Sequence, residues 1–285
     1  MTEATPGTLF IVSTPIGNMG DFSFRAVDVL KSVALVLAED TRHTRHLLDR
    51  YGISTPMAPY HEHNEAKSSP RFVARLLDGE SLALVSDAGT PLVSDPGARL
   101  VRAAIDAGVG VVPIPGPSAA LAALVASGLD ADRFLFLGFL PRSGGDRRAA
   151  FDEILGSVQT VVVYESPNRL ADTLAELERL GGGLRPAVVA REMTKQFENI
   201  QRGTVADLLA YYRERPVRGE VVLLIAGKGA VDQVASEEDV AARVRALRAA
   251  GLSARDASAQ VAAEMGVSKR VAYRLARGGG GETGE

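Results

Sequence analysis

Residues 82–97 read LALVSDAGTPLVSDPG, a short apolar run followed by a loop of small and turn-forming residues. The run Leu82–Val85 predicts a strand covered on both faces, which is typical of a parallel sheet. Glycine, proline and aspartate punctuate the loop, and the alanine-rich segment from Ala98 predicts a helix. Small side chains after the carboxyl end of a parallel strand let a ligand approach the backbone, so this loop is predicted to hold a ligand.

The same strand-loop-helix pattern occurs twice more in the first half of the chain. The apolar runs at 9–13 and 109–114 end in the loops TPIGN and PGPSAA. Further strands are predicted at 33–38 and 57–61, alternating with helices at 22–32, 44–51, 65–77, 98–107 and about 119–127, the first capped by Asp21. This alternation predicts a doubly wound parallel sheet whose three strand-end loops converge on one cleft.

The second half of the chain has a less regular pattern. Strands are predicted at 134–140, 160–164, 187–190, 199–203 and 221–226, with 199–203 as a possible antiparallel element, and helices at 169–180 and 205–212. Residues 141–145, PRSGG, are interpreted as an exposed connector. We therefore expect a mixed second sheet in an α/β protein of two domains, divided as 1–116 and 117–230.

A third region begins at Ser236, where the pattern becomes entirely helical. Helices are predicted from 237 to 250, from a cap at Ser253 to about 265, and from a cap at Ser268 to 277, with a disordered tail at 278–285. Residues 236–277 hold eight Arg or Lys against five Asp or Glu. Helix, glycine turn and short basic helix is the outline of a helix-turn-helix, although a plain helical cap with a solvated face fits the same pattern.

Composition excludes several classes of protein. The chain has 285 residues and no cysteine, which excludes disulfides, a cysteine nucleophile and thiolate metal sites. A basic leader followed by an apolar stretch is absent, and no apolar run approaches the roughly 18 residues that span a bilayer. A cytoplasmic protein without a membrane partner is expected. The net charge of −3 predicts that any nucleic-acid contact comes from a local basic face.

Polar clusters follow three of the buried-type strands, as EDTR at 39–42, YESPNR at 164–169 and REMTK at 191–195. Side chains at strand ends can reach a cleft, so the three clusters together favour a site.

All four histidines lie between 43 and 63, but His61 and His63 would face opposite sides of a strand and their spacing fits no metal signature. No metal is expected. The Walker A and GxSxG motifs are also absent.

Eight segments of the chain resemble, in order, the ribosomal RNA small-subunit methyltransferase I family of the tetrapyrrole-methylase-like superfamily. They are IVSTPIGNMGDFSFRAVDVLKS, AEDTRHTRHLL, HEHNE, SDAGTPLVSDPG, PIPGPSAA, GFLPR, YESPNRL and AREMTK. The likeness runs from about residue 9 to 228. It implies two α/β domains with an S-adenosylmethionine cleft between them, a homodimer, a C-terminal helix-turn-helix, and methylation of a cytidine ribose 2′-hydroxyl in the decoding region of 16S rRNA.

The resemblance also implies cofactor contacts, transferred by matching position. They are Ile16 in the first loop, then Ala88, Gly89, Thr90, Val93, Ser118, Ala119, Glu165 and Ala226. Asn168 departs from the family, whose members often carry histidine there, so no titrating imidazole is expected at this position.

A ribose hydroxyl is a weak nucleophile at neutral pH, so a positioned base is expected to assist its attack. Candidates for the base are Asp40, His61 and Glu192, and these three stay unranked. Candidate partners for a phosphate or an oxyanion are Arg42, Arg191 and Lys195.

RNA rather than DNA is the expected polymer, held by the cleft rim and the basic helices around Arg255, Lys269, Arg270 and Arg274. Two alternatives remain open from the sequence. A tetrapyrrole methyltransferase would share the fold and cofactor, and a non-catalytic ribosome-assembly factor would use only the basic tail.

Overall fold

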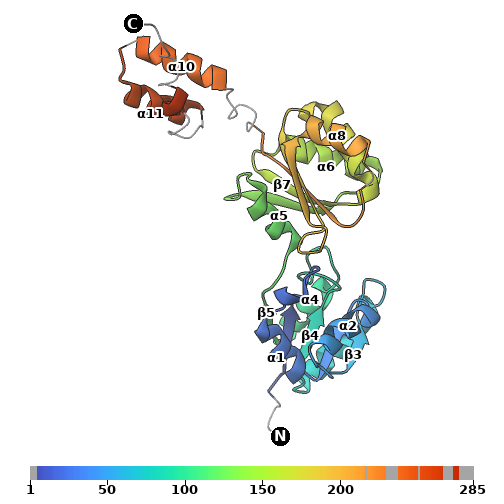
Figure 1. Ribbon diagram of the computed structural model, residues 1–285. Helices are drawn as coiled ribbons and strands as arrows, with labels where there is room; N and C mark the ends of the chain where they lie inside the picture. Colours follow the sequence, from blue (N-terminus) through green and yellow to red (C-terminus); the bar gives the residue numbers. More distant parts are fainter. Residues whose placement is uncertain (1–4, 216, 229–236, 250, 266–271, 276–285) are drawn as a thin grey trace.

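The first half of the chain forms a five-stranded parallel sheet (Figure 1). The structure is a computed structural model that describes residues 5–215, 217–228, 237–249, 251–265 and 272–275. In this sheet the strand order is β3-β2-β4-β1-β5, and every pairing is parallel. The strands are β1 (Thr8–Val12), β2 (Leu35–Ala38), β3 (Met57–Pro59), β4 (Leu82–Val85) and β5 (Gly110–Ile114). The predicted parallel sheet is confirmed.

Helices cover both faces of this sheet, as its doubly wound pattern requires. The helices are α1 (Phe24–Ser32), α2 (Thr41–Arg50), α3 (Glu65–Leu77) and α4 (Ala98–Asp106). One core holds Leu30 of α1 and Leu48 of α2, and a second core, on the other face, holds Leu76 of α3 and Leu100 of α4. The central strands are buried on both sides, which explains why β2 and β4 are continuous apolar runs.

The prediction that Asp21 caps α1 was wrong. Residues Met19–Asp21 form a 3-10 turn, η1, capped by the side chain of Asn18. The helix begins at Phe24 and is capped by Ser23, whose hydroxyl accepts a hydrogen bond from the amide of Ala26 at 3.1 Å. A serine cap displaces the aspartate because Asp21 is already inside the preceding turn.

The second half forms a mixed sheet, as predicted, in the order β6-β7-β10-β8-β9. Only β6 and β7 pair in parallel, and the other three pairings are antiparallel. The strands are β6 (Phe134–Phe139), β7 (Thr160–Glu165), β8 (Pro186–Arg191), β9 (Asn199–Thr204) and β10 (Val221–Ile225). The possible antiparallel element at 199–203 is therefore strand β9, at the edge of this sheet.

Helices also cover both faces of the second sheet. One face is covered by α6 (Gly144–Gly156), α7 (Leu170–Leu177) and α8 (Val205–Arg213), with the short turns η2 (Pro167–Arg169) and η3 (Glu178–Gly182) beside α7. The opposite face packs on α5 (Ala119–Ser127), whose Ala123 and Leu124 are buried against Val162 and Leu224. Helix α5 follows the last strand of the first sheet, so it carries the chain from one sheet to the other.

Helix α6 was missed by the sequence interpretation, which assigned only a connector at 141–145. Its buried residues are Phe151 and Ile154, and the rest of the helix is largely polar or small. Two buried positions in 13 residues form too narrow an apolar stripe for the periodicity to be recognised.

The C-terminal region contains α10 (Glu237–Ala249) and α11 (Ala254–Met265), and residues 272–275 are helical. Val240, Val244 and Val261 form a small core with Ala272. The amide of Asp256 donates to the hydroxyl of Ser253 at 3.1 Å, so the predicted cap is confirmed. The predicted turn at Gly266, the cap at Ser268 and the tail at 278–285 lie outside the described residues. Over the described part of the chain, no helix has the length and apolar character that crossing a membrane requires.

Candidate active site

Three strand-end loops of the first sheet meet at one edge, as their sequences predict. Thr14 and Gly89 exchange backbone hydrogen bonds of 2.8 and 3.1 Å, which join the loops after β1 and β4. The hydroxyl of Thr90 donates to the carbonyl of Pro117 at 3.1 Å and lies 3.0 Å from the hydroxyl of Ser13. The side chain of Thr90 therefore ties the loop after β4 to both neighbouring loops.

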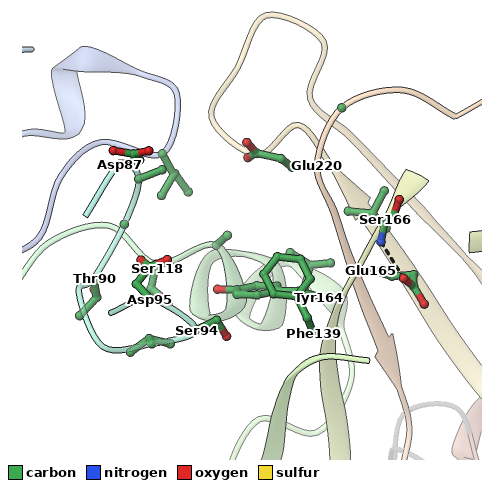
Figure 2. Close-up of a pocket in the computed structure, with 18 of the residues that line it drawn as sticks. Asp87, Thr90, Ser94, Asp95, Ser118, Phe139, Tyr164, Glu165, Ser166 and Glu220 are labelled. Atoms are coloured by element: carbon green, nitrogen blue, oxygen red, sulfur yellow. Dashed lines mark hydrogen bonds between the residues drawn. The ribbon is translucent and has the colours of Figure 1, made fainter. Parts of the chain in front are cut away.

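A cavity of about 450 Å³ opens beside these loops, and both sheets contribute to its wall. This volume is in the range of roughly 300–1,000 Å³ that small-molecule sites occupy. Figure 2 shows the first-sheet loop with Asp87, Asp95 and Thr90 on one side and Tyr164, Phe139 and Glu220 of the second sheet on the other. Of the nine predicted cofactor contacts, eight line this cavity, namely Ile16, Ala88, Gly89, Thr90, Val93, Ser118, Ala119 and Glu165.

The backbone of the loop after β4 is unusual. Leu92 and Ser94 have φ values of 73° and 68°, in the left-handed region that favours glycine. Such residues cost roughly 1–3 kcal/mol each and persist only where the surroundings fix them. Gly97 has φ 137°, and a Cβ there would lie 2.6 Å from a side-chain carbon of Leu84. The loop is thus held in one strained path around the cavity.

Carboxylates dominate the polar part of the cavity wall. Glu39, Asp87, Asp95 and Glu220 all line it. Burial raises the pKa of Glu39, and the negative charges of Asp95 and Asp87 raise it further. Burial also raises the pKa of Asp95, with a contribution from Asp87, although a hydrogen bond with Ser86 acts in the opposite direction. The wall therefore carries mutually repelling charges, and a positively charged ligand would relieve that repulsion.

Glu39 and Asp95 were not among the individual catalytic or cofactor-binding candidates, although Glu39 belongs to the predicted cluster at 39–42 and Asp95 to the predicted ligand loop. Each stands next to a motif that was recognised, Glu39 before Asp40 and Asp95 at the end of the strand-end loop. The position of a carboxylate directly after a buried strand was the available signal, but it did not distinguish Glu39 from its neighbour Asp40.

Asp40 does not line the cavity but contacts its wall. Its amide donates to a carboxylate oxygen of Asp87 at 3.0 Å. Its own carboxylate caps α2, accepting from the amide of Arg42 at 2.8 Å and pairing with the guanidinium of Arg42 at 2.8 Å. The hydrogen bonds from Arg42 hold the pKa of Asp40 well below its usual range. A carboxylate held in this way is a weak proton acceptor.

His61 follows β3, at the edge of the first sheet, and also lies outside the cavity wall. Its Nε2 lies 3.2 Å from the side-chain amide of Asn64, whereas its Nδ1 is buried without a hydrogen-bond partner. The ring of His63 lies 6.0 Å away, measured between centroids. Within the described ranges, no group of three or more His, Cys, Asp or Glu side chains is placed to hold a metal ion.

Glu192 and Lys195 form a charged cluster with Glu220, which lines the cavity. The ammonium of Lys195 lies 3.0 Å from the carboxylate of Glu192 and 3.1 Å from that of Glu220. The amide of Glu220 also donates to Glu192 at 2.9 Å, and this bond together with Lys195 lowers the pKa of Glu192. Arg191, next in the chain, donates to the carbonyl of Arg218 at 3.3 Å.

The same segment contacts the first sheet. The hydroxyl of Thr194 accepts from the amide of Asn18 at 3.1 Å, and a Cβ on Gly17 would lie 2.4 Å from the Lys195 side chain. The loop after β1 therefore fits closely against the segment after β8, at the rim of the cavity.

The carboxylate of Glu165 points away from the cavity into the core behind β7. Its side chain is fully buried, accepts from the hydroxyl of Thr173 at 2.6 Å, and pairs with Arg169 at 2.5 Å and Arg147 at 3.8 Å. The amide of Ser166 donates to it at 2.7 Å, as the dashed line in Figure 2 shows. Ala226, the ninth predicted contact, is buried after β10 and does not line the cavity.

The comparisons with known proteins agree with this architecture. The family model described as Tetrapyrrole (Corrin/Porphyrin) Methylases matches residues 8–209. Among solved structures, a cobalt precorrin-4 methyltransferase superposes with a TM-score of 0.56 at 17% identity, covering 79% of this chain and 96% of the other. Uroporphyrin III C-methyl transferase of Thermus thermophilus gives 0.55 at 20% identity, covering 77% and 97%. At such low identity these two structures show the fold alone.

Sequence relatives are much closer. The chain is 47% identical over 272 residues to the ribosomal RNA small subunit methyltransferase I of Pseudomonas aeruginosa, covering 95% of this chain and 96% of that protein. Its identity to the protein of the same name in Escherichia coli O157:H7 is 45% over 279 residues, covering 96% of each. The chain therefore belongs to the tetrapyrrole methylase family and, within it, to the ribosomal RNA small-subunit methyltransferase I group.

Proposed function

We propose that this protein transfers a methyl group from S-adenosylmethionine to the ribose 2′-hydroxyl of a cytidine in the decoding region of 16S rRNA. The observation that carries the proposal is the identity of 47%, over 95% of the chain, to a protein named ribosomal RNA small subunit methyltransferase I. The choice of the 2′-hydroxyl of a cytidine rests on the family resemblance of the quoted motifs.

The test of this proposal uses the purified chain, S-adenosylmethionine carrying a labelled methyl group, and small ribosomal subunits from a strain that lacks the protein. We expect the label in 16S rRNA, as 2′-O-methylcytidine after digestion to nucleosides. A porphyrin-like acceptor serves as the comparison substrate. Label in that acceptor and none in the RNA would contradict the proposal.

The cavity suits S-adenosylmethionine in charge as well as in size. The cofactor carries two positive groups, a sulfonium and an ammonium, and the wall presents Glu39, Asp87 and Asp95. The cofactor would be held by these carboxylates, by the backbone around Gly89 and by Ser118, the N-cap of α5. When bound, S-adenosylmethionine supplies a methyl group activated by the positive sulfur.

The contribution of the protein is mainly positioning. Alignment of two reactants in one site is worth effective molarities of about 10⁵ M or more. The strained loop after β4 and the side-chain ties of Thr90 fix one wall of the cavity before any ligand arrives. A preorganised wall lowers the entropic cost of alignment.

Asp95 provides a direct test of the cofactor site. We expect Asp95→Asn to weaken S-adenosylmethionine binding by about ten- to 100-fold, because hydrogen bonds to charged groups contribute roughly 1.5–3 kcal/mol. The same change should stabilise the ligand-free protein, because burial raises the pKa of Asp95 and thus opposes its ionised form. Calorimetric titration and thermal unfolding measure the two effects, and a loss of both affinity and stability would indicate misfolding instead.

The pH dependence of the Asp95 effect follows from the sign of its shift. The folded-state pKa is raised above 3.8, so the stabilising contribution of the protonated group is present below that pH and is lost as pH rises through the folded-state value. The stability gap between Asp95→Asn and the wild type should therefore be smallest in acid and should widen towards neutral pH.

Residues 236–277 are proposed to bind RNA through their basic surface, since phosphate neutralisation dominates such affinity. Arg255 is exposed on α11, whereas Lys269 and Arg270 lie outside the described residues. Deletion of residues 236–285 should weaken binding to small subunits and reduce its salt dependence, while S-adenosylmethionine affinity is unchanged. Filter binding at several salt concentrations and calorimetry measure these effects. Equal losses of both affinities would assign the region a folding role.

A homodimer is proposed from the apolar surface that one chain leaves exposed. Leu121 and Val125 of α5 and Val112 of β5 are exposed large apolar residues. Sedimentation should give twice the chain mass of 30.0 kDa, and a monomer at micromolar concentration would contradict this proposal.

A further inference from the structure

Two aromatic rings form part of the cavity wall on the side of the second sheet. Phe139, at the end of β6, is 61% exposed and lies 5.2 Å from the half-buried ring of Tyr164, measured between centroids. Both line the cavity, and Figure 2 shows them side by side, across from the loop that carries Ser94 and Asp95. The ring of Phe136 lies against the same tyrosine, with the two ring centroids 5.1 Å apart.

A β-bulge places Phe139 in this position. Phe136 and Phe139 are three residues apart, so in a regular strand they would point to opposite faces of the sheet. The register of β6 against β7 shifts between Phe136 and Gly138, which brings both phenylalanines against Tyr164. Bulges next to functional sites commonly re-aim a side chain in this way.

Gly138 allows the bulge and the close approach of the opposite loop. Its φ is +65°, and a Cβ there would lie 2.9 Å from the hydroxyl of Ser94. The first-sheet loop and the aromatic end of β6 therefore approach each other closely at the cavity wall.

The chain after Phe139 is fixed from behind by buried charges. Arg169 donates to the carbonyl of Leu140 at 2.9 Å, and Arg147 donates to the carbonyl of Pro141 at 2.9 Å. Both guanidinium groups pair with Glu165, which follows Tyr164 directly and points to the opposite face of the sheet. The aromatic pair is thus preorganised even though its outer ring is exposed to solvent.

We propose that Phe139 and Tyr164 form a stacking platform for the nucleobase of the acceptor nucleotide. This inference rests on the proposed function and deepens it. Glu39, Asp87 and Asp95 lie on the first-sheet wall and suit the cationic cofactor, and Glu220 lies on the second-sheet side. The aromatic pair faces the first-sheet carboxylates, and its outer ring, Phe139, is exposed to solvent and open to a larger substrate. A base that leaves the stack of an RNA is commonly received by aromatic side chains, and every base offers a π-face. The platform therefore provides affinity and position rather than base selection.

The test compares Phe139→Leu with Phe139→Tyr. Leucine keeps an apolar surface but loses the planar ring, and tyrosine keeps the ring. We expect Phe139→Leu to raise KM for small subunits by about five- to 150-fold, the range equivalent to one base stack, and Phe139→Tyr to stay within about twofold of the wild type. Phe134→Leu, at the far end of the same strand, is the matched control. S-adenosylmethionine affinity, measured by calorimetry, should be the same in all variants.

Four results would overturn this inference. One is a Phe139→Leu variant equal to the wild type. A second is a loss of S-adenosylmethionine affinity as large as the rise in KM, which would assign the platform to the adenine of the cofactor. A third is a change of mass in solution for Phe139→Leu, which would assign the ring to a contact between chains.

The fourth result comes from measuring the affinity of the protein for 16S rRNA without cofactor, so this part of the test does not depend on turnover. A wild-type protein that binds RNA but transfers no methyl group contradicts the proposed function, whereas equal RNA affinity of wild type and Phe139→Leu contradicts the platform alone.

Discussion

Glu165→Ala is expected to lower the stability of the protein by about 3 kcal/mol or more, and its melting temperature by roughly 6–12 °C. The carboxylate is fully buried and holds Arg147 and Arg169, whose side chains are themselves mostly buried. Removing it leaves two cations without their counter-charge, and breaking a buried ion pair by removing one partner is costly. Thermal or denaturant unfolding of the purified variant measures the effect.

Glu176→Ala provides the matched control, since Glu176 also pairs with an arginine that follows it closely in the chain, Arg179, but this pair lies on the surface. Exposed pairs contribute about 0–1 kcal/mol, so this variant should unfold close to the wild type. The stability of Glu165→Gln should lie between those of Glu165→Ala and Glu176→Ala, because the glutamine side chain keeps a hydrogen-bond acceptor for Thr173 but loses the charge. Equal stability of Glu165→Ala and Glu176→Ala would show that the buried cluster does not stabilise the second sheet.

The proton acceptor is addressed by His61→Gln, Asp40→Asn and Glu192→Gln. A general base contributes roughly 10²- to 10⁴-fold, and we expect the largest loss of single-turnover rate, about 10²-fold, for His61→Gln. Hydrogen bonds hold the pKa of Asp40 and of Glu192 low, which makes both poor proton acceptors, so His61 is the candidate that remains by elimination.

Rapid mixing of cofactor-loaded enzyme with small subunits measures these rates, and S-adenosylmethionine affinity controls for damage to the cavity. Asp40→Asn and Glu192→Gln should change the rate mainly by releasing their ion-pair partners, Arg42 and Lys195. These two cations, together with Arg191, are proposed to contact phosphate or an oxyanion. Wild-type rates in all three variants would exclude these groups as the base.

The first sheet was predictable because its signals are local. Each strand is an apolar run that ends in glycine, proline or a polar cluster, and α3 begins and ends at the predicted residues, Glu65 and Leu77. The convergence of the three loops followed from the parallel arrangement alone, because the carboxyl ends of parallel strands share one edge.

The features that escaped prediction depend on contacts between distant segments. The residue pattern marks Glu165 as a strand-end carboxylate, but whether it faces the cavity or the core depends on arginines of α6 and η2. The placement of Phe139 depends on a bulge, which no period-two pattern reveals. Asp95 became notable only when the loop folded next to Asp87 and Glu39.

The most direct test of the central claim is a map of ribose methylation in 16S rRNA from a strain that lacks this protein. The map is compared with those of the same strain complemented with the wild type or with Asp95→Asn. We predict that one cytidine 2′-O-methyl group in the decoding region is absent without the protein, returns with the wild type, and returns incompletely with Asp95→Asn. An identical methylation map with and without the protein would contradict the account.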